Sequence, residues 1–131
     1  MSTLHLEEWL RHFDPLPLEC DGLSRVISAL LNKSGVEHKM VVGFLHGASS
    51  EGQATPRRIL HWWIELGNQT IDLRARMWMG HRAPHGLFDP ATLTEFRYEA
   101  VSTEHRSSPS LQILSVMAGI DLATLPALSP L

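Results

Sequence analysis

The chain of 131 residues contains one cysteine, Cys20, so no disulfide can form within it and no cysteine-rich zinc site is possible. Basic residues are also few: 11 Lys and Arg against 14 Asp and Glu give a net charge of -3. This balance argues against a nucleic acid or an anionic membrane as partner. No apolar run reaches transmembrane length, and Glu7 and Glu8 stand where a signal peptide would be basic. We therefore expect a cytoplasmic protein with no nucleic-acid or membrane partner.

What the chain does contain is typical of a globular protein, with 44% hydrophobic residues. The length favours one domain over 1–131, with a core over about 16–102 and a C-terminal helix and tail over 103–131. Apolar spacing and turn residues predict an α+β fold in which N-terminal helices pack on a small antiparallel sheet of three or four strands. The expected helices cover 3–13, 20–33 and 110–120, with a short one after Asp89-Pro90, and the expected strands cover 39–45, 59–66, 69–73 and 96–101. The remaining segments are expected to be a polar loop over 47–56, a long loop or lid over 74–90, a linker over 104–109 and a loose tail over 121–131.

Cys20 stands where the second predicted helix begins. Unpaired N–H groups and the positive end of the helix dipole stabilise a thiolate there, which favours a nucleophilic role. Gly22 lacks a side chain, so it would leave the backbone near the sulfur open to a substrate. The alternative for Cys20 is a buried structural cysteine, because free cysteine is among the most buried residue types.

His61 and Asp72 lie on two predicted strands joined by the turn residues Gly67-Asn68. A hairpin closed there places His61 and Asp72 within side-chain reach. An acid on one imidazole nitrogen would fix the tautomer and leave the other nitrogen facing a thiol. Alternatives remain for each residue taken singly: a strand histidine bonded to backbone, and a strand-end acid.

Four blocks over about 55 residues carry a resemblance to a known family. They are Cys20 through Leu31, Gly35-Val36-Glu37-His38-Lys39-Met40-Val41-Val42-Gly43-Phe44, His61-Trp62-Trp63-Ile64-Glu65 and Ile71-Asp72-Leu73. In this order they resemble the core of the transglutaminase-like cysteine enzymes, a branch of the papain-like fold. The run Cys20-Asp21-Gly22-Leu23 is also similar to the NlpC/P60 branch, but the strand around Val42 fits the transglutaminase-like branch better.

The resemblance implies a papain-like core with Cys20 as nucleophile, His61 as general base and acid, and Asp72 as the residue that orients His61. It implies a thiol-dependent acyl-transfer enzyme acting on a peptide or protein amide, with no cofactor and no metal. Hydrolysis, as in a cysteine peptidase or a glutamine deamidase, is the first expectation and transfer to an amine the second. The alternative is a catalytically inactive member of the fold that serves as a protein-binding module, with Trp62, Trp63 and Trp78 as its contact surface.

Further residues are candidates for supporting roles. Trp62, Trp78 and Gly22 are expected to line the substrate site, and the run 74–79 is a candidate wall of a groove. The oxyanion formed during acyl transfer needs the Cys20 N–H and one more donor. Trp9 or His12 could supply that donor, although a core role for Trp9 and a surface position for His12 are the simpler interpretation.

Two clusters favour no special chemistry. His81 and His85 have metal-ligand spacing for a helix, but Pro84 between them makes a helix improbable, so we expect no zinc site. Four arginines could form a small basic patch, for which a solvated surface is the default interpretation. They are Arg57, Arg58, Arg74 and Arg76.

Overall fold

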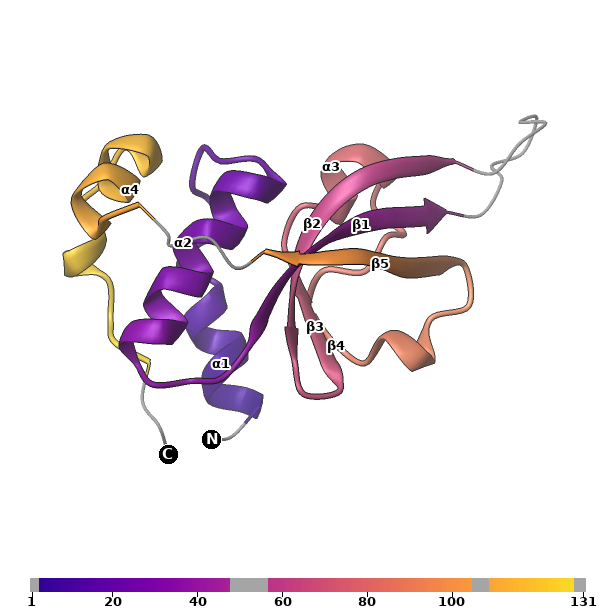
Figure 1. The fold of residues 1–131 in the computed structure, drawn as a ribbon, viewed down its shortest axis with the longest axis horizontal. Helices are drawn as coiled ribbons and strands as arrows, with labels where there is room; N and C mark the ends of the chain where they lie inside the picture. The colour runs from indigo at the N-terminus through magenta and orange to yellow at the C-terminus, as the bar shows by residue number, and fades with distance from the viewer. Residues whose placement is uncertain (1–2, 48–56, 105–108, 129–131) are drawn as a thin grey trace.

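The computed structural model describes residues 3–47, 57–104 and 109–128, and it confirms an α+β fold (Figure 1). Five antiparallel strands form one open sheet in the order β4-β3-β2-β1-β5. The strands are β1 (Lys39–Gly47), β2 (Arg58–Leu66), β3 (Gln69–Asp72), β4 (Gly86–Phe88) and β5 (Phe96–Glu104). The helices are α1 (Thr3–Leu10), α2 (Cys20–Lys33), α3 (Ala75–Met79) and α4 (Leu111–Ala118), with 3-10 turns at Pro90–Thr92 and Leu122–Thr124.

Helix α2 is the central helix, and it starts and ends where the sequence predicts. Its apolar residues repeat at helical spacing and are buried, which places one face of α2 on the sheet beside Ile64 and Ile71. The chain leaves the helix through Gly35, whose φ of 73° lies in the left-handed region that suits glycine. This packing fixes the direction of α2, and therefore the position of Cys20 at its first residue.

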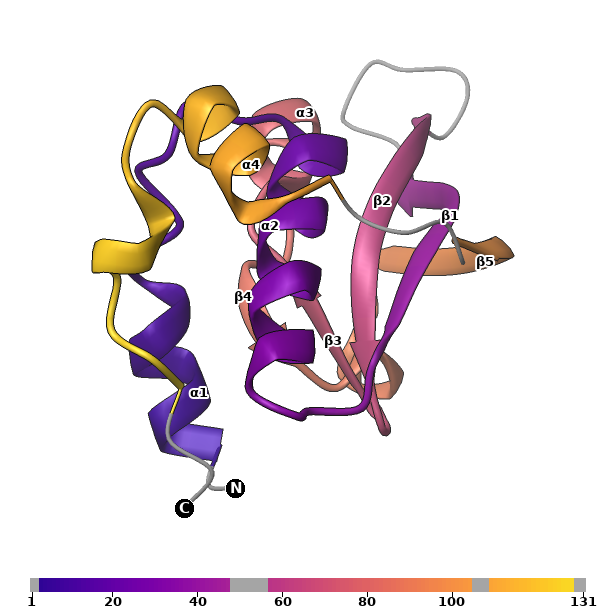
Figure 2. The ribbon, with the colours of Figure 1, turned by 60° about the vertical axis from the view of Figure 1, so that its left-hand side comes forward.

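The terminal elements pack around α2: α4 contacts it directly, and the segment that follows α4 runs beside α1 (Figure 2). The first helix ends at Leu10, three residues before the predicted end, and turns continue the chain to Pro15. The prediction of a loose tail is wrong for 121–128. Leu122 and Leu128 are buried in the main core, and the Trp9 indole N–H donates to the carbonyl of Pro126 at 3.0 Å.

The predicted loop or lid over 74–90 is also wrong. This segment forms α3 and then β4, which pairs with β3 and adds a fifth strand to the sheet. Ala75, Met79 and Ala83 are buried with Leu45 in a second apolar cluster. Burial of these apolar residues stabilises a segment whose prolines and glycines suggest a loop. The polar loop and the linker fall, for 48–56 and 105–108, outside the described residues.

Strand β1 lies close to β5 at Gly43, where the register between the two strands shifts. A Cβ at this position would overlap the Glu99 carbonyl oxygen and would stand 2.8 Å from the Trp63 ring. Glycine therefore allows β5 to approach, and Trp63 packs edge-on against Tyr98 of β5 at 5.0 Å between centroids. This contact brings the Tyr98 side chain to the site described below.

None of the described helices has the length and apolar character needed to cross a membrane.

Candidate active site

The structure brings His61 and Asp72 into direct contact, as the hairpin predicts. Ile64 of β2 pairs with Ile71 of β3. The next residue of β3, Asp72, therefore lies diagonally opposite His61 on the same face of the sheet. His61 Nε2 and Asp72 Oδ2 are 2.8 Å apart, and both side chains are buried. The Asp72 carboxylate and the His61 imidazole therefore interact in a buried environment, where water does not screen their attraction.

The other nitrogen of His61, Nδ1, is buried and has no hydrogen-bond partner among the described residues. Cys20, partly exposed at the start of α2, also interacts with the ring, and Trp63 stacks on it with 6.4 Å between the ring centroids. Burial opposes the charge on the imidazole, but Asp72 and then Cys20 outweigh it and raise the pKa of His61 to about 9. The ring is therefore an imidazolium at neutral pH, held by a carboxylate on one side and beside a thiol on the other. We call Cys20, His61 and Asp72 the triad.

Asp72 is fixed by two further donors. The Tyr98 hydroxyl donates to Oδ2 at 2.7 Å, and the Arg74 backbone N–H donates to Oδ1 at 2.9 Å. Burial, with the charge and hydrogen bond of Asp72, raises the pKa of Tyr98, so the phenol stays protonated and donates. Sequence reasoning missed Tyr98, although it is the only tyrosine of the chain and lies in a predicted strand. The pairing of β5 with β1 places it there, and no local pattern predicts that pairing.

Tyr98→Phe is expected to slow alkylation of Cys20 by iodoacetamide at neutral pH by about 3- to 10-fold and to lower the unfolding free energy by about 1 kcal/mol. The phenyl ring keeps the packing on Trp63, so the loss comes from the missing donor to Asp72. Intact-mass kinetics and urea unfolding measure the two effects. An unchanged alkylation rate would mean that Tyr98 does not help to hold Asp72.

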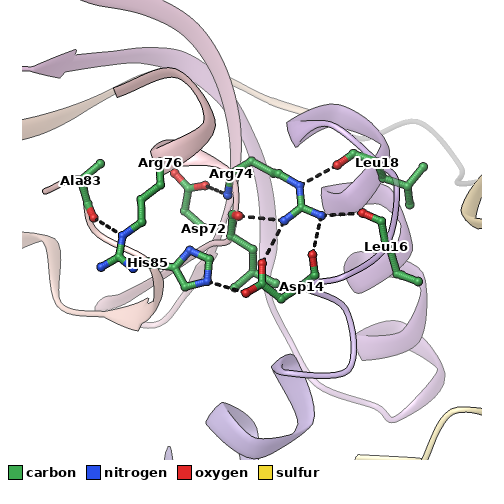
Figure 3. A network of polar contacts seen from close by, with 9 residues as sticks. Asp14, Leu16, Leu18, Asp72, Arg74, Arg76, Ala83 and His85 are labelled. Carbon is green, nitrogen blue, oxygen red and sulfur yellow. Dashed lines mark hydrogen bonds and ion pairs between the residues drawn. The ribbon is translucent and has the colours of Figure 1, made fainter. Parts of the chain in front are cut away.

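Arg74 is buried, with 7% of its surface exposed, so the prediction of a four-arginine surface patch is wrong for this residue. Its guanidinium contacts the loop before α2, over 14–18, and Figure 3 shows this network. Sequence reasoning missed this role because a solvated face is the usual place of an arginine. The one sequence feature that links Arg74 to the site is its position two residues after Asp72.

The expected substrate residues have different outcomes. Trp62 is half-buried and lines a small cavity together with Cys20, and the Arg25 guanidinium lies 5.3 Å from its ring centroid. Trp78 lies exposed on α3, away from the residues that line this cavity. The role given to Gly22 is wrong: the residue is buried, and a Cβ there would meet the Leu18 side chain at 3.2 Å. The missing side chain accommodates Leu18 and does not open the backbone to a substrate.

Trp9 cannot supply the second oxyanion donor, because it is buried in the core and its indole N–H is bonded to the carbonyl of Pro126. The core interpretation of Trp9 is therefore confirmed, and His12 is exposed as the simpler interpretation has it. His85 Nε2 lies 3.0 Å from a carboxylate oxygen of Asp14, and His81 is exposed. Across the described ranges, no three His, Cys, Asp or Glu side chains gather as potential metal ligands.

A groove of about 450 Å³ lies between the loop before α2 and helix α3, and it is lined by sequence neighbours of Cys20 and Asp72 but by no member of the triad itself. Its lining includes Glu19, the neighbour of Cys20, and the run 16–18 on one side, with Arg76 and Met77 on the other. A larger hollow of about 640 Å³ lies at the far end of α2, where His38 and Glu65 line it and no member of the triad does. The smaller groove is therefore the better candidate for a substrate site, because it is adjacent to a possible nucleophile.

No protein-family model, no curated protein and no solved structure matches this chain. The assignment of a function therefore depends on the geometry of the site.

Proposed function

We propose that this protein is a thiol-dependent acyl-transfer enzyme with a transglutaminase-like, papain-like core, in which Cys20, His61 and Asp72 are the catalytic residues. The observation that carries the proposal is the buried imidazole of His61. One nitrogen is bonded to Asp72, the other has no hydrogen-bond partner in the described chain, and Cys20 contributes to the raised pKa of the ring. A histidine with a purely structural role would be expected to have both nitrogens bonded, since buried polar atoms rarely lack partners.

In the proposed reaction, the Cys20 thiolate attacks the carbonyl carbon of an amide. His61 holds the proton at Nδ1 and transfers it to the leaving nitrogen, so the C–N bond breaks, an amine departs and a thioester forms on Cys20. Water, or an amine, then gives a proton to His61 and attacks the thioester carbonyl. The acyl group leaves as an acid or a new amide, and Cys20 returns to its starting state. Asp72 stabilises the imidazolium throughout, and the cycle requires no metal and no organic cofactor.

Substrate access is supported by the groove that passes Glu19. Its walls combine the apolar Leu16 and Pro17 with the exposed Met77 and the charged Arg76. A peptide segment fits these chemical properties, because the methionine side chain adapts to varied apolar partners. The predicted contact of the 74–79 run with a substrate therefore remains part of the proposal for Arg76 and Met77, whereas Trp78 lies outside the residues that line the groove.

A direct test uses p-nitrophenyl acetate as an activated acyl donor and intact mass as the readout. We expect one acetyl group on the wild-type chain within seconds to minutes, followed by its loss through hydrolysis. Cys20→Ala is expected to remain unmodified, and because the chain has no other cysteine the adduct is unambiguous. A glutamine-containing peptide, with and without a fluorescent primary amine, then separates release of ammonia into water from transfer to the amine.

The proposal fails if wild-type Cys20 is acetylated no faster than a cysteine in a short peptide and His61→Ala has the same rate. That outcome would favour the alternative of an inactive binding module. The described surface would then offer Trp62 and Trp78 but not Trp63, which is 1% exposed and lies within the core.

A further inference from the structure

The third buried charged side chain of this region, after His61 and Asp72, is that of Arg74, which lies outside the triad but bonds to Asp72 and to the loop before Cys20. Its backbone N–H donates to Asp72, as described above, and its side chain extends in the opposite direction, to the loop that leads into α2 (Figure 3). Asp72 and the start of α2 are separated by more than fifty residues of sequence. Arg74 bonds to Asp72 and to the loop that leads into α2.

The guanidinium uses all five of its N–H donors. Nε donates to the Leu18 carbonyl at 2.6 Å, and Nη2 donates to the carbonyls of Leu16 at 2.8 Å and Asp14 at 3.0 Å. Nη1 donates to the Asp14 carboxylate at 3.1 Å and to the Leu73 carbonyl at 2.9 Å. Five donors in a planar fork are specific to arginine, since lysine has three donors on a single nitrogen.

The positions of the acceptors identify the segment of the chain that the Arg74 guanidinium holds in place. Three of them are alternate backbone carbonyls of the run Asp14-Pro15-Leu16-Pro17-Leu18, in which two prolines supply no N–H and the chain cannot form a regular helix. Cys20 follows two residues later. Glu19, the N-cap residue of α2, makes no capping hydrogen bond with its side chain. The start of α2 therefore depends on the loop that Arg74 holds.

The cost of burying the guanidinium is compensated locally. Asp14 supplies the opposite charge, and its carboxylate, 47% exposed, also contacts His85. A buried cation with every donor bonded and one acid beside it is stable. Removal of its donors takes away the Arg74 bonds to the Asp14 and Leu18 carbonyls, whereas the Leu16 carbonyl keeps the Leu18 N–H.

We propose that Arg74 is a positioning residue that holds the loop over 14–18 and thereby sets the distance between Cys20 and the His61–Asp72 pair. This inference rests on the proposed function. Arg74 borders the groove, but its guanidinium donors are all taken by the loop and the Leu73 carbonyl, so none is left for a reacting atom. Arg74 acts through the placement of Cys20, while the backbone N–H of residue 74 orients Asp72 independently of the side chain.

The test is a double-mutant cycle read on the His61 imidazole by NMR titration, together with iodoacetamide alkylation of Cys20. Arg74→Lys keeps a buried cation and the backbone N–H to Asp72, but cannot bond to all five acceptors. We expect at least a tenfold slower alkylation at neutral pH. We also expect the His61 pKa to fall to the value found in Cys20→Ala, because the thiol has moved away while Asp72 remains. Combining Arg74→Lys with Cys20→Ala is then expected to cause no additional fall.

Arg82→Lys is the matched control, since Arg82 is exposed and its guanidinium pairs with Glu95 instead of with the loop. It is expected to leave both readouts unchanged. If Arg74→Lys does not fold, Asp14→Asn takes its place: it weakens the ion pair at a half-exposed position and is expected to slow alkylation about threefold, whereas His85→Gln does not.

The possible negative results distinguish the proposed function from the proposed role of Arg74. Wild-type alkylation that does not depend on His61 would refute the proposed function. Alkylation that depends on His61 but is unchanged in folded Arg74→Lys, or a His61 pKa that falls additively with Cys20→Ala, would refute the positioning role alone.

Discussion

Asp72→Asn is expected to slow alkylation and acetylation of Cys20 at neutral pH by about 100-fold or more. Asparagine keeps the size of the side chain but removes the negative charge that faces His61 Nε2 at 2.8 Å. The imidazolium then loses its main stabilising partner. The amide group can also donate to Nε2, which leaves a neutral ring in a tautomer that presents a proton to the thiol and cannot accept one. Rates from intact mass, on protein shown to be folded, measure the effect.

Asp89→Asn is the control for this substitution, because Asp89 is exposed and caps the turn at Pro90–Thr92. The chemical change is the same, but no member of the triad contacts the residue in the described structure. We expect the wild-type rate. If the two variants had equal rates, the pair of His61 and Asp72 would have no part in activating Cys20.

The second large effect is on stability as a function of pH. The pKa of His61 is raised from 6.5 to about 9 in the folded chain, with burial opposing the shift and Asp72 and Cys20 causing it. The folded state therefore binds this proton more tightly than the unfolded state. The stabilisation is fully present below about pH 6.5 and is lost as the pH rises through about 9. Over this window the His61 proton alone is expected to lower the unfolding free energy by about 3 kcal/mol.

Urea unfolding of wild type and His61→Gln at several pH values isolates this contribution as a difference. His61→Gln is expected to lose most of the decline, whereas His81→Gln, at an exposed position, is expected to retain it. If wild type and His61→Gln had the same pH dependence of the unfolding free energy, the raised pKa of His61 would be contradicted, and with it the imidazolium at neutral pH.

Local sequence patterns were sufficient to predict the elements whose residues are close together in the sequence. The apolar spacing of α2 and the turn residues Gly67-Asn68 between two predicted strands predict elements that the structure confirms, and the hairpin alone predicts the contact of His61 with Asp72. The helix start at Cys20 follows from the same pattern. These features depend on residues that are close in sequence.

The missed parts depend on long-range packing. Tyr98 reaches Asp72 because β5 pairs with β1 across a strand order that local patterns do not reveal, and Arg74 reaches the loop of Asp14 across about sixty residues. Segment 74–90 folds because Ala75, Met79 and Ala83 are covered by Leu45 of another element. The apolar residues of this segment do not recur at helical or strand spacing, so the sequence alone does not predict their burial.

The measurement that tests the central claim most directly is the rate of Cys20 alkylation by iodoacetamide as a function of pH, in wild type and in His61→Ala. The account predicts that wild-type Cys20 reacts quickly well below about pH 8, where an ordinary thiol is mostly protonated. It also predicts that His61→Ala loses this reactivity while remaining folded. If both proteins instead reacted slowly and with the same pH profile as a simple thiol, His61 would not activate Cys20, and the proposed catalytic triad would be contradicted.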